Sequence, residues 1–128
     1  MNKLKELIKT IFIYTLLLIV FILLAGKFNF AMVSGHSMDP TLNDGDFLIV
    51  YAKEPEDKDI VILTTEGKET SADFVVKRYY AELSDENGYW VEGDNKNNSL
   101  DSRKLGTFDK ENFCGVAIFD ISQFKILK

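Results

Sequence analysis

The sequence predicts a mostly β domain that follows a single amino-terminal transmembrane helix. Residues 10–26 contain no charged side chain, whereas the rest of the chain alternates short apolar runs with turn residues. No segment after residue 26 keeps a 3.6-residue apolar period over three turns, so we expect no second long helix. We therefore divide the 128 residues into a cytoplasmic tip and membrane anchor, 1–27, and one compact domain built on a β-sheet or barrel-like sheet, 28–128.

The amino-terminal segment has the pattern of a membrane anchor. Lys3, Lys5 and Lys9 precede the apolar run, and Lys27 follows it. The run measures about 26 Å as a helix, slightly less than a hydrocarbon core of about 30 Å, and the flanking lysines can reach the interface. A cleaved secretory signal also starts with basic residues, but this run is longer than a usual signal core and no small-x-small cleavage site follows it. The lysine excess at the amino-terminal side predicts that residues 28–128 lie outside the cytoplasm.

Six later segments have the composition of β-strands. They are rich in β-branched and aromatic residues and are separated by turn residues. These segments are residues 28–33, 47–51, 60–63, 74–80, 89–91 and 113–119. An Asn-Gly pair at residues 87–88 predicts a hairpin turn before the fifth of them.

Charge and cysteine content exclude several classes of function. The formal net charge is −5, and residues 27–128 alone carry −7 because three basic residues and one acidic residue precede them. Phosphate binding needs clustered Lys and Arg, so this acidic balance argues against nucleic acid as a partner. Cys114 is the only cysteine and His36 the only histidine. A single cysteine excludes a disulfide framework, and one cysteine with one histidine is too few for the usual zinc site. We therefore expect neither a metal nor a cofactor.

The segment Val-Ser-Gly-His-Ser-Met-Asp-Pro-Thr-Leu, residues 33–42, contains a candidate nucleophile. Ser37 lies among small residues and shortly before Pro40, as a nucleophile on a rigid turn requires. His36 is its immediate neighbour, and adjacent side chains of an extended chain point in opposite directions. This geometry argues against a Ser-His-Asp triad and favours an exposed loop histidine.

Lys77 is a better candidate for the base. It lies in the predicted strand 74–80, where alternation places Val75 and Tyr79 on its face and Arg78 on the other. Partial desolvation lowers the pKa of an amine, and a base near neutral pH needs a fall from about 10.4 to about 7–8. Taken alone, the strand favours the alternative, a lysine on an edge strand whose stem lies on apolar surface and whose amine reaches water.

A third polar segment, Gly-Asp-Asn-Lys-Asn-Asn-Ser-Leu-Asp-Ser-Arg, occupies residues 93–103. By composition it is a solvated loop, in which Asp101 and Arg103 are spaced for an ion pair across a turn. Taken alone, the segment indicates no catalysis.

In order, these three segments resemble the type I (Ser-Lys) signal peptidases of bacteria, over about residues 1–119. The resemblance implies a Ser-Lys signal peptidase catalytic domain in which Ser37 is the nucleophile and Lys77 the general base. It further implies that Ser99 hydrogen-bonds and orients the lysine, that Asp101 and Arg103 form a supporting salt bridge, and that Ser102 belongs to the same support. The endoplasmic-reticulum branch of this family has histidine at the base position, so Lys77 indicates the bacterial type.

The same resemblance implies a membrane-bound endopeptidase that removes signal peptides from exported preproteins after small residues, Ala-x-Ala. Its expected partners are these preproteins and the lipid bilayer, with the secretion translocon as a further candidate. Position 35 is Gly where some members carry a serine donor, so the backbone N–H of Ser37 is the remaining candidate for the oxyanion. Gly35 is also what the Gram-positive type of the family carries. Only 15 residues separate Arg78 from Asp94, which leaves no room for the large accessory domain of many Gram-negative members, so the resemblance is to a minimal, Gram-positive-like form.

Two other classes of function share this residue pattern. One is a signal-peptidase-like factor for pilus or surface assembly, with a dedicated substrate or a non-catalytic role; the intact Ser37 and Lys77 argue against the non-catalytic version. The other is a self-cleaving Ser-Lys repressor, which needs a DNA-binding helical domain and no membrane anchor. Residues 1–27 contradict that second reading.

Overall fold

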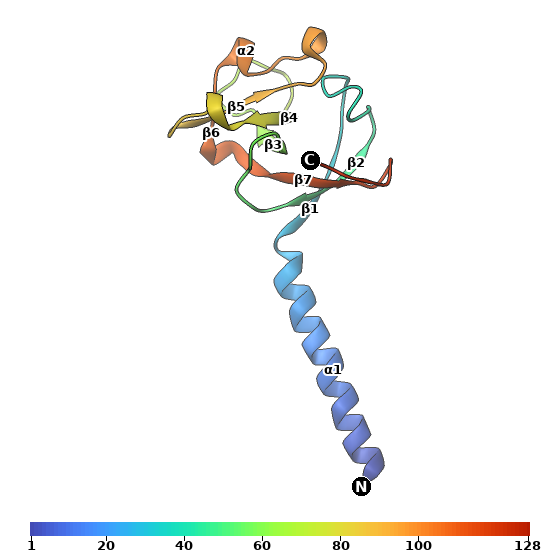
Figure 1. Cartoon of the computed structure of the whole chain (residues 1–128). Coiled ribbons are helices and arrows are strands. Elements are labelled where there is room, and N and C mark those ends of the chain that lie inside the picture. Colours follow the sequence, from blue (N-terminus) through green and yellow to red (C-terminus); the bar gives the residue numbers. More distant parts are fainter.

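A 24-residue helix, α1 (Asn2–Ala25), precedes all of the β structure and projects from it as a separate stalk (Figure 1). None of its residues is buried in this computed structural model, which describes residues 1–128. It is the one helix in the chain that is long and apolar enough to cross a membrane. The helix starts eight residues before the uncharged run, since the Leu, Lys and Glu residues there are good helix formers.

Eight strands form the rest of the molecule, and the mostly β fold class is confirmed. The strands are β1 (Phe28–Met32), β2 (Phe47–Tyr51), β3 (Ile60–Thr64), β4 (Phe74–Tyr80), β5 (Gly88–Glu92), β6 (Phe108–Asp109), β7 (Phe113–Asp120) and β8 (Lys125–Ile126). The six predicted strands are all present, with bounds that differ by at most one residue at each end. The two-residue strands β6 and β8 were not predicted, because so short a segment carries no alternation.

The strands form one antiparallel sheet in the order β1-β2-β7-β3-β4-β5-β6, and β8 pairs with β7. The register of β7 shifts against both of its long neighbours in the sheet order, β2 and β3: Ile49 pairs with Phe119 but Val50 with Ala117, and a second shift falls between Ile62 and Leu63. Such irregularities bend a strand and increase its twist. The sheet is accordingly curled (Figure 1), and β1 and β4, which are not neighbours in it, line the same groove.

The core consists of two buried clusters that meet at β3. Ile60 and Ile62 belong to the first cluster, whereas Val61 and Leu63 belong to the second. This alternation means that β3 is buried on both faces, which explains its uninterrupted apolar sequence. The first cluster contains residues on either side of the turn at Ser37, and the second contains Tyr79 of β4. Both candidate catalytic segments are therefore attached to the core.

The connection between β4 and β5 differs from the predicted tight turn. The two strands are antiparallel neighbours, but a 3-10 helix, η1 (Ala81–Leu83), intervenes before Asn87. The Asp85 carboxylate accepts hydrogen bonds of 2.9 Å from the N–H groups of both Asn87 and Gly88. An Asx-type turn organised by Asp85 thus replaces a two-residue Asn-Gly hairpin.

Two further 3-10 helices, η2 (Lys96–Asn98) and η3 (Lys110–Asn112), and a four-residue helix, α2 (Ser102–Leu105), complete the domain. The side chain of Asp101 caps α2 by accepting a hydrogen bond from the N–H of Arg103.

Candidate active site

The turn that carries Ser37 is held on both sides. Met38 and Leu42, which follow Ser37, are buried in the first core cluster. Before the turn, the N–H of Val33 donates to the carbonyl of Asp46 at 2.8 Å. These contacts fix the backbone around the hydroxyl, so its position is set before any substrate binds.

Gly35 shapes the approach to Ser37. It adopts a φ of 90°, a conformation that glycine accepts without strain, and its N–H donates to Asp44 Oδ1 at 2.7 Å. No side chain at position 35 is available to donate a hydrogen bond. The N–H of Ser37 donates none within the protein, which leaves it free to bind an oxygen atom of a bound molecule.

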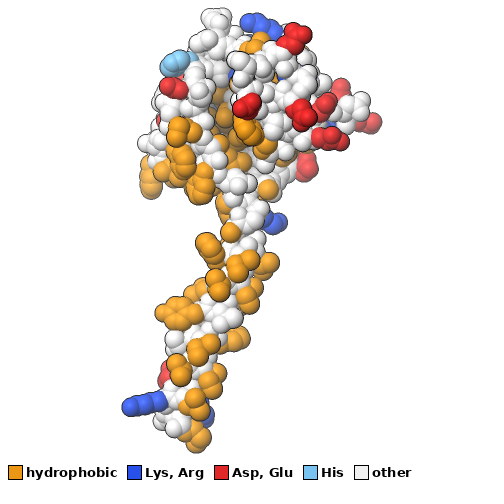
Figure 2. Space-filling model, turned by 180° about the vertical axis from the view of Figure 1, so that it is seen from behind, with side chains coloured by type: hydrophobic (Ala, Val, Ile, Leu, Met, Phe, Trp, Pro, Cys, Tyr) orange, Lys and Arg blue, Asp and Glu red, His pale blue; other side chains and the backbone are white.

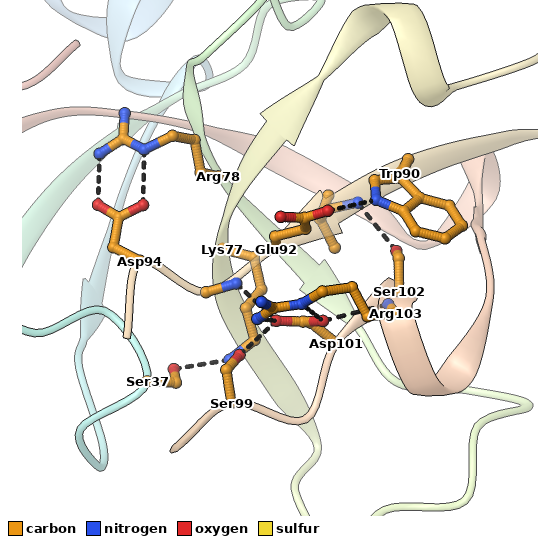
Figure 3. Close-up of polar contacts among 12 residues, drawn as sticks. Ser37, Lys77, Arg78, Trp90, Glu92, Asp94, Ser99, Asp101, Ser102 and Arg103 are labelled. Carbon is orange, nitrogen blue, oxygen red and sulfur yellow. Dashed lines mark hydrogen bonds and ion pairs between the residues drawn. The ribbon is translucent and has the colours of Figure 1, made fainter. Parts of the chain in front are cut away.

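Lys77 extends from β4 to the Ser37 turn (Figure 3). It is 4% exposed, and its Nζ donates a hydrogen bond of 2.6 Å to Ser37 Oγ. Tyr79 is buried on the same face of β4 and Val75 packs against the same cluster, as the alternation predicts. Burial is the main cause that lowers the pKa of Lys77 to about 8; the charge of Asp101 opposes this shift and that of Arg103 adds to it. The amine is therefore suited to exchange a proton near neutral pH.

Asp101 is the centre of a buried hydrogen-bond network beside Lys77 (Figure 3). It has no exposed surface and accepts hydrogen bonds from Ser99 Oγ at 2.6 Å and from the N–H of Gly93 at 2.7 Å. Arg103 forms a bidentate ion pair with Asp101, in which Nε donates to Oδ1 at 3.0 Å and Nη2 donates to Oδ2 at 2.7 Å. Burial alone would raise the pKa of Asp101, but the hydrogen bonds from Arg103, Gly93 and Ser99 outweigh it and hold this pKa well below its ordinary value. The carboxylate therefore stays ionised.

Ser99 lies at the site but makes a different contact from the one that the family resemblance implies. Its hydroxyl donates to Asp101, and no hydrogen bond joins it to Lys77. Gly93 packs directly against it: a Cβ at Gly93 would overlap Ser99 Oγ and lie 2.5 Å from the carbonyl oxygen of Ser37. Gly93 thus allows the polar loop and the Ser37 turn to approach each other, a role that its sequence context alone did not indicate.

Ser102 lies apart from Ser37 and Lys77, at the start of α2. It is 2% exposed, and its Oγ accepts a hydrogen bond of 2.9 Å from the N–H of Val91 in β5. The contact attaches the start of α2 to the sheet, while Ser102 itself touches neither Ser37 nor Lys77 through a hydrogen bond.

The imidazole of His36 does not reach the Ser37 hydroxyl. Its Nδ1 lies 3.0 Å from Asp39 Oδ2, and 60% of the side chain is exposed. His36 is therefore an exposed loop histidine that is paired with Asp39.

A groove of about 630 Å³ lies in front of Ser37 and Lys77, and most of the residues that line it are hydrophobic. Both β1 and β4 contribute to its walls. Each has an unpaired edge there: β1 pairs only with β2, and residues 74–77 of β4 pair only with β3. Unpaired strand edges offer N–H and C=O groups to an extended peptide. The site therefore combines a hydroxyl, a partly neutral amine and a peptide-sized groove.

The residues and their order agree with one protein family in particular. A family model described as "Signal peptidase, peptidase S26" matches residues 4–85 and 82–121, which together include most of α1, the Ser37 turn, β4 and the polar loop. The chain belongs to the S26 signal peptidases. No individual curated protein matches it.

The signal peptidase contains a second ion pair at the site, to which the sequence analysis assigned no role. Arg78 donates to Asp94 through Nε at 2.8 Å and Nη2 at 2.7 Å (Figure 3). Asp94 also accepts a hydrogen bond of 2.5 Å from Thr41 Oγ1. In the sequence, Arg78 directly follows Lys77, and Asp94 belongs to the Gly-Asp pair of the polar loop. Neither position indicates that the two side chains form an ion pair.

Proposed function

We propose that this signal peptidase is a serine endopeptidase in which Ser37 is the nucleophile and Lys77 the general base. The observation that carries the proposal is the 2.6 Å hydrogen bond between Lys77 Nζ and Ser37 Oγ. It is supported by the burial of Lys77, which lowers its pKa to about 8 and so makes the neutral amine accessible near physiological pH.

The chemistry follows from these atoms. Neutral Lys77 accepts the hydroxyl proton while Ser37 Oγ forms a bond to the carbonyl carbon of the scissile peptide. The N–H of Ser37 stabilises the resulting oxyanion, and Lys77 then transfers its proton to the leaving nitrogen as the C–N bond breaks. Lys77 next takes a proton from water, whose oxygen attacks the acyl-enzyme. Collapse of this second intermediate releases the new carboxyl group and returns the proton to Ser37.

The substrate is proposed to be the signal sequence of an exported preprotein, bound as an extended strand in the groove. The unpaired edges of β1 and of residues 74–77 in β4 supply main-chain partners. The preference for small residues, Ala-x-Ala, rests on the resemblance to type I signal peptidases.

Asp101 and its partners are proposed to position the base. The buried carboxylate joins Ser99, Gly93 and Arg103, and its charge acts on Lys77. Ser102 holds the beginning of α2 against β5. None of these side chains needs to react, because their contribution is to keep Lys77 aligned with Ser37.

The proposed topology has a cytoplasmic tip and anchor at residues 1–27 and a catalytic domain outside the cytoplasm at residues 28–128. Helix α1 is the candidate membrane span, and Lys3, Lys5 and Lys9 lie at its start. Tethering enzyme and preprotein to one bilayer raises the effective concentration of the cleavage site. Protease added to intact spheroplasts should digest residues 28–128; full protection of the domain would contradict this orientation.

The dyad is tested by cleavage of an Ala-x-Ala signal peptide in detergent. Ser37→Ala and Lys77→Ala should each abolish cleavage, while circular dichroism shows that both variants fold. His36→Ala, a change at the neighbouring residue, should remain active. Cleavage by Ser37→Ala or Lys77→Ala at the wild-type rate would reject the dyad, and complete loss in His36→Ala would restore the histidine as a base.

A further inference from the structure

A second, smaller hollow lies where the helix meets the β domain. Its volume is about 410 Å³, and only hydrophobic residues line it: Phe21, Leu24, Ala25, Phe28 and Phe30. Phe21, Leu24 and Ala25 have the spacing i, i+3, i+4, which places them on one face of α1. The hollow lies beside that face, and the small side chain of Ala25 forms part of its wall.

This hollow adjoins the active-site groove. Phe30 lines both of them. On β1, Phe28, Phe30 and Met32 alternate with their neighbours and so share one side of the strand, where they are 36%, 63% and 65% exposed. Hydrophobic side chains also gather on the part of the β domain that lies towards α1 (Figure 2). An apolar track therefore leads from the site of cleavage to the end of the helix.

The length of β1 is comparable to that of the short cleavage region of a signal sequence. The five residues of β1 span about 17 Å at about 3.4 Å per residue. A substrate extended along β1 would therefore cover the strand with about five residues, and α1 ends at Ala25, just before β1 begins at Phe28. In a signal sequence, the apolar core directly precedes the short cleavage region, so that core would begin beside α1.

We propose that the α1 face formed by Phe21, Leu24 and Ala25 binds the apolar helical core of the signal sequence. This inference rests on the proposed function of the groove. Between helices in lipid there is little hydrophobic driving force, so association depends on close packing at small residues and open spaces. The hollow beside Ala25 offers such a place. On this view the helix contributes to substrate selection as well as attaching the enzyme to the bilayer.

Photo-crosslinking tests the contact directly. The full chain carrying Ser37→Ala is placed in phosphatidylethanolamine–phosphatidylglycerol vesicles with an intact preprotein, and p-benzoylphenylalanine replaces Leu24, Leu23 or Met32 in turn. Leu23 is the matched control, because it is a leucine at the same depth but on the opposite face of the helix. We expect preprotein adducts from positions 24 and 32 but not from position 23.

The other outcomes separate the inference from the proposed function. Adducts from position 32, with equal yields or only lipid adducts at positions 23 and 24, would overturn the docking face and leave the groove intact. Absence of preprotein adducts from position 32 as well would overturn both.

A kinetic test uses a substitution that fills the hollow. Ala25→Leu should lower the ratio of kcat/KM for a whole preprotein to kcat/KM for a short peptide without the apolar core, by about fivefold. Leu23→Phe adds a similar bulk on the opposite face and should keep the wild-type ratio. An unchanged ratio in Ala25→Leu would overturn the inference.

Discussion

Arg78 binds Asp94 through two parallel hydrogen bonds, although 16 positions separate the two residues in the chain. Asp94 also accepts a hydrogen bond from Thr41, in the segment that follows Ser37. The pair therefore joins the strand of Lys77 to the polar loop and to the Ser37 turn. We infer that the alignment of nucleophile and base depends on this ion pair as well as on the Asp101 network.

Replacing Arg78 by lysine should separate charge from geometry. Arg78→Lys keeps the positive charge but cannot donate two parallel hydrogen bonds to Asp94. We expect kcat to fall by about 10- to 100-fold, as small displacements of reacting groups do, with a smaller change in KM. Steady-state cleavage of a signal peptide measures both. Lys128→Met, which removes the exposed ion pair with Glu56, should retain wild-type kcat; a wild-type kcat in Arg78→Lys would contradict the alignment role.

The pH dependence of cleavage should report the protonation of Lys77. Its pKa is lowered to about 8, so kcat/KM should rise as pH increases through about 8, where the amine becomes neutral. The charge of Asp101 raises the pKa of Lys77, so Asp101→Asn should move this acidic limb to lower pH while reducing the maximal rate. A pH–rate profile from pH 5 to pH 10 measures both effects. An acidic limb that moves upward in Asp101→Asn would show that a different group controls it.

Replacing Tyr79 should move the acidic limb of the pH–rate profile in the opposite direction, to higher pH. It is buried on the Lys77 face of β4, where it packs against Tyr89 with ring centroids 5.2 Å apart. Tyr79→Ser should admit water beside the amine and raise the pKa of Lys77 towards its ordinary value, which moves the acidic limb up by about one pH unit. The same pH–rate profile measures the shift. If the limb does not move, Tyr79 does not keep Lys77 dry, and the argument from strand alternation is wrong.

The sequence predicts the elements of this fold more completely than its contacts. Strands such as β3 and β4 are long enough to show uninterrupted or alternating apolar residues, and these patterns depend only on neighbours along the chain. The two-residue strands β6 and β8 form because longer elements pass beside them. Likewise, the turn before β5 depends on the side chain of Asp85, which competes with the Asn-Gly preference that the sequence displays.

The candidate site divides in the same way. Ser37 and Lys77 were recognisable because each lies in a short motif and the motifs follow one another in a family-specific order. The hydrogen-bond partner of Ser99 was not recognisable from the sequence. Several polar groups lie near its hydroxyl in the chain, and only the packed structure shows that it donates to Asp101. The ion pair of Arg78 with Asp94 also forms between distant segments. Patterns along the chain therefore indicate candidate reactive residues, whereas the contacts between distant segments at the site arise from tertiary packing.

Gly93 should tolerate no side chain. A Cβ there would overlap Ser99 Oγ and lie 2.5 Å from the carbonyl oxygen of Ser37, so Gly93→Ala has to displace one of the two segments. We expect a loss of about 1–3 kcal/mol in the free energy of unfolding, together with reduced cleavage. Denaturant unfolding in detergent and the peptide assay measure these changes. Gly26→Ala is the control for stability, since its Cβ would meet no atom within 4 Å; equal stability of the two variants would refute the packing argument.

The buried carboxyl groups of Asp46 and Asp120 should make stability depend on pH. Asp120 has no exposed surface, and its Oδ2 has no hydrogen-bond partner. Asp46 lies beside it and accepts hydrogen bonds from the side chain of Gln123 and the N–H of Asn43. Burial first, and then the hydrogen bond and charge of Asp46, raise the pKa of Asp120 above its ordinary value. We therefore expect protonated Asp120 to share its proton with Asp46.

A raised pKa in the folded state gives a contribution to stability that is complete below pH 3.8 and is lost as pH rises through the folded value. In Asp120→Asn, an amide supplies the shared hydrogen at every pH. Its melting temperature should therefore exceed that of the wild type by roughly 4 °C at pH 8, and the difference should shrink towards pH 4. Lys125 is the cation whose charge acts on Asp46. Circular dichroism melts in detergent test this, with Asp109→Asn, at an exposed carboxylate, as the control. A difference between Asp120→Asn and wild type that is the same at pH 4 and pH 8 would mean that the two carboxyl groups do not share a proton.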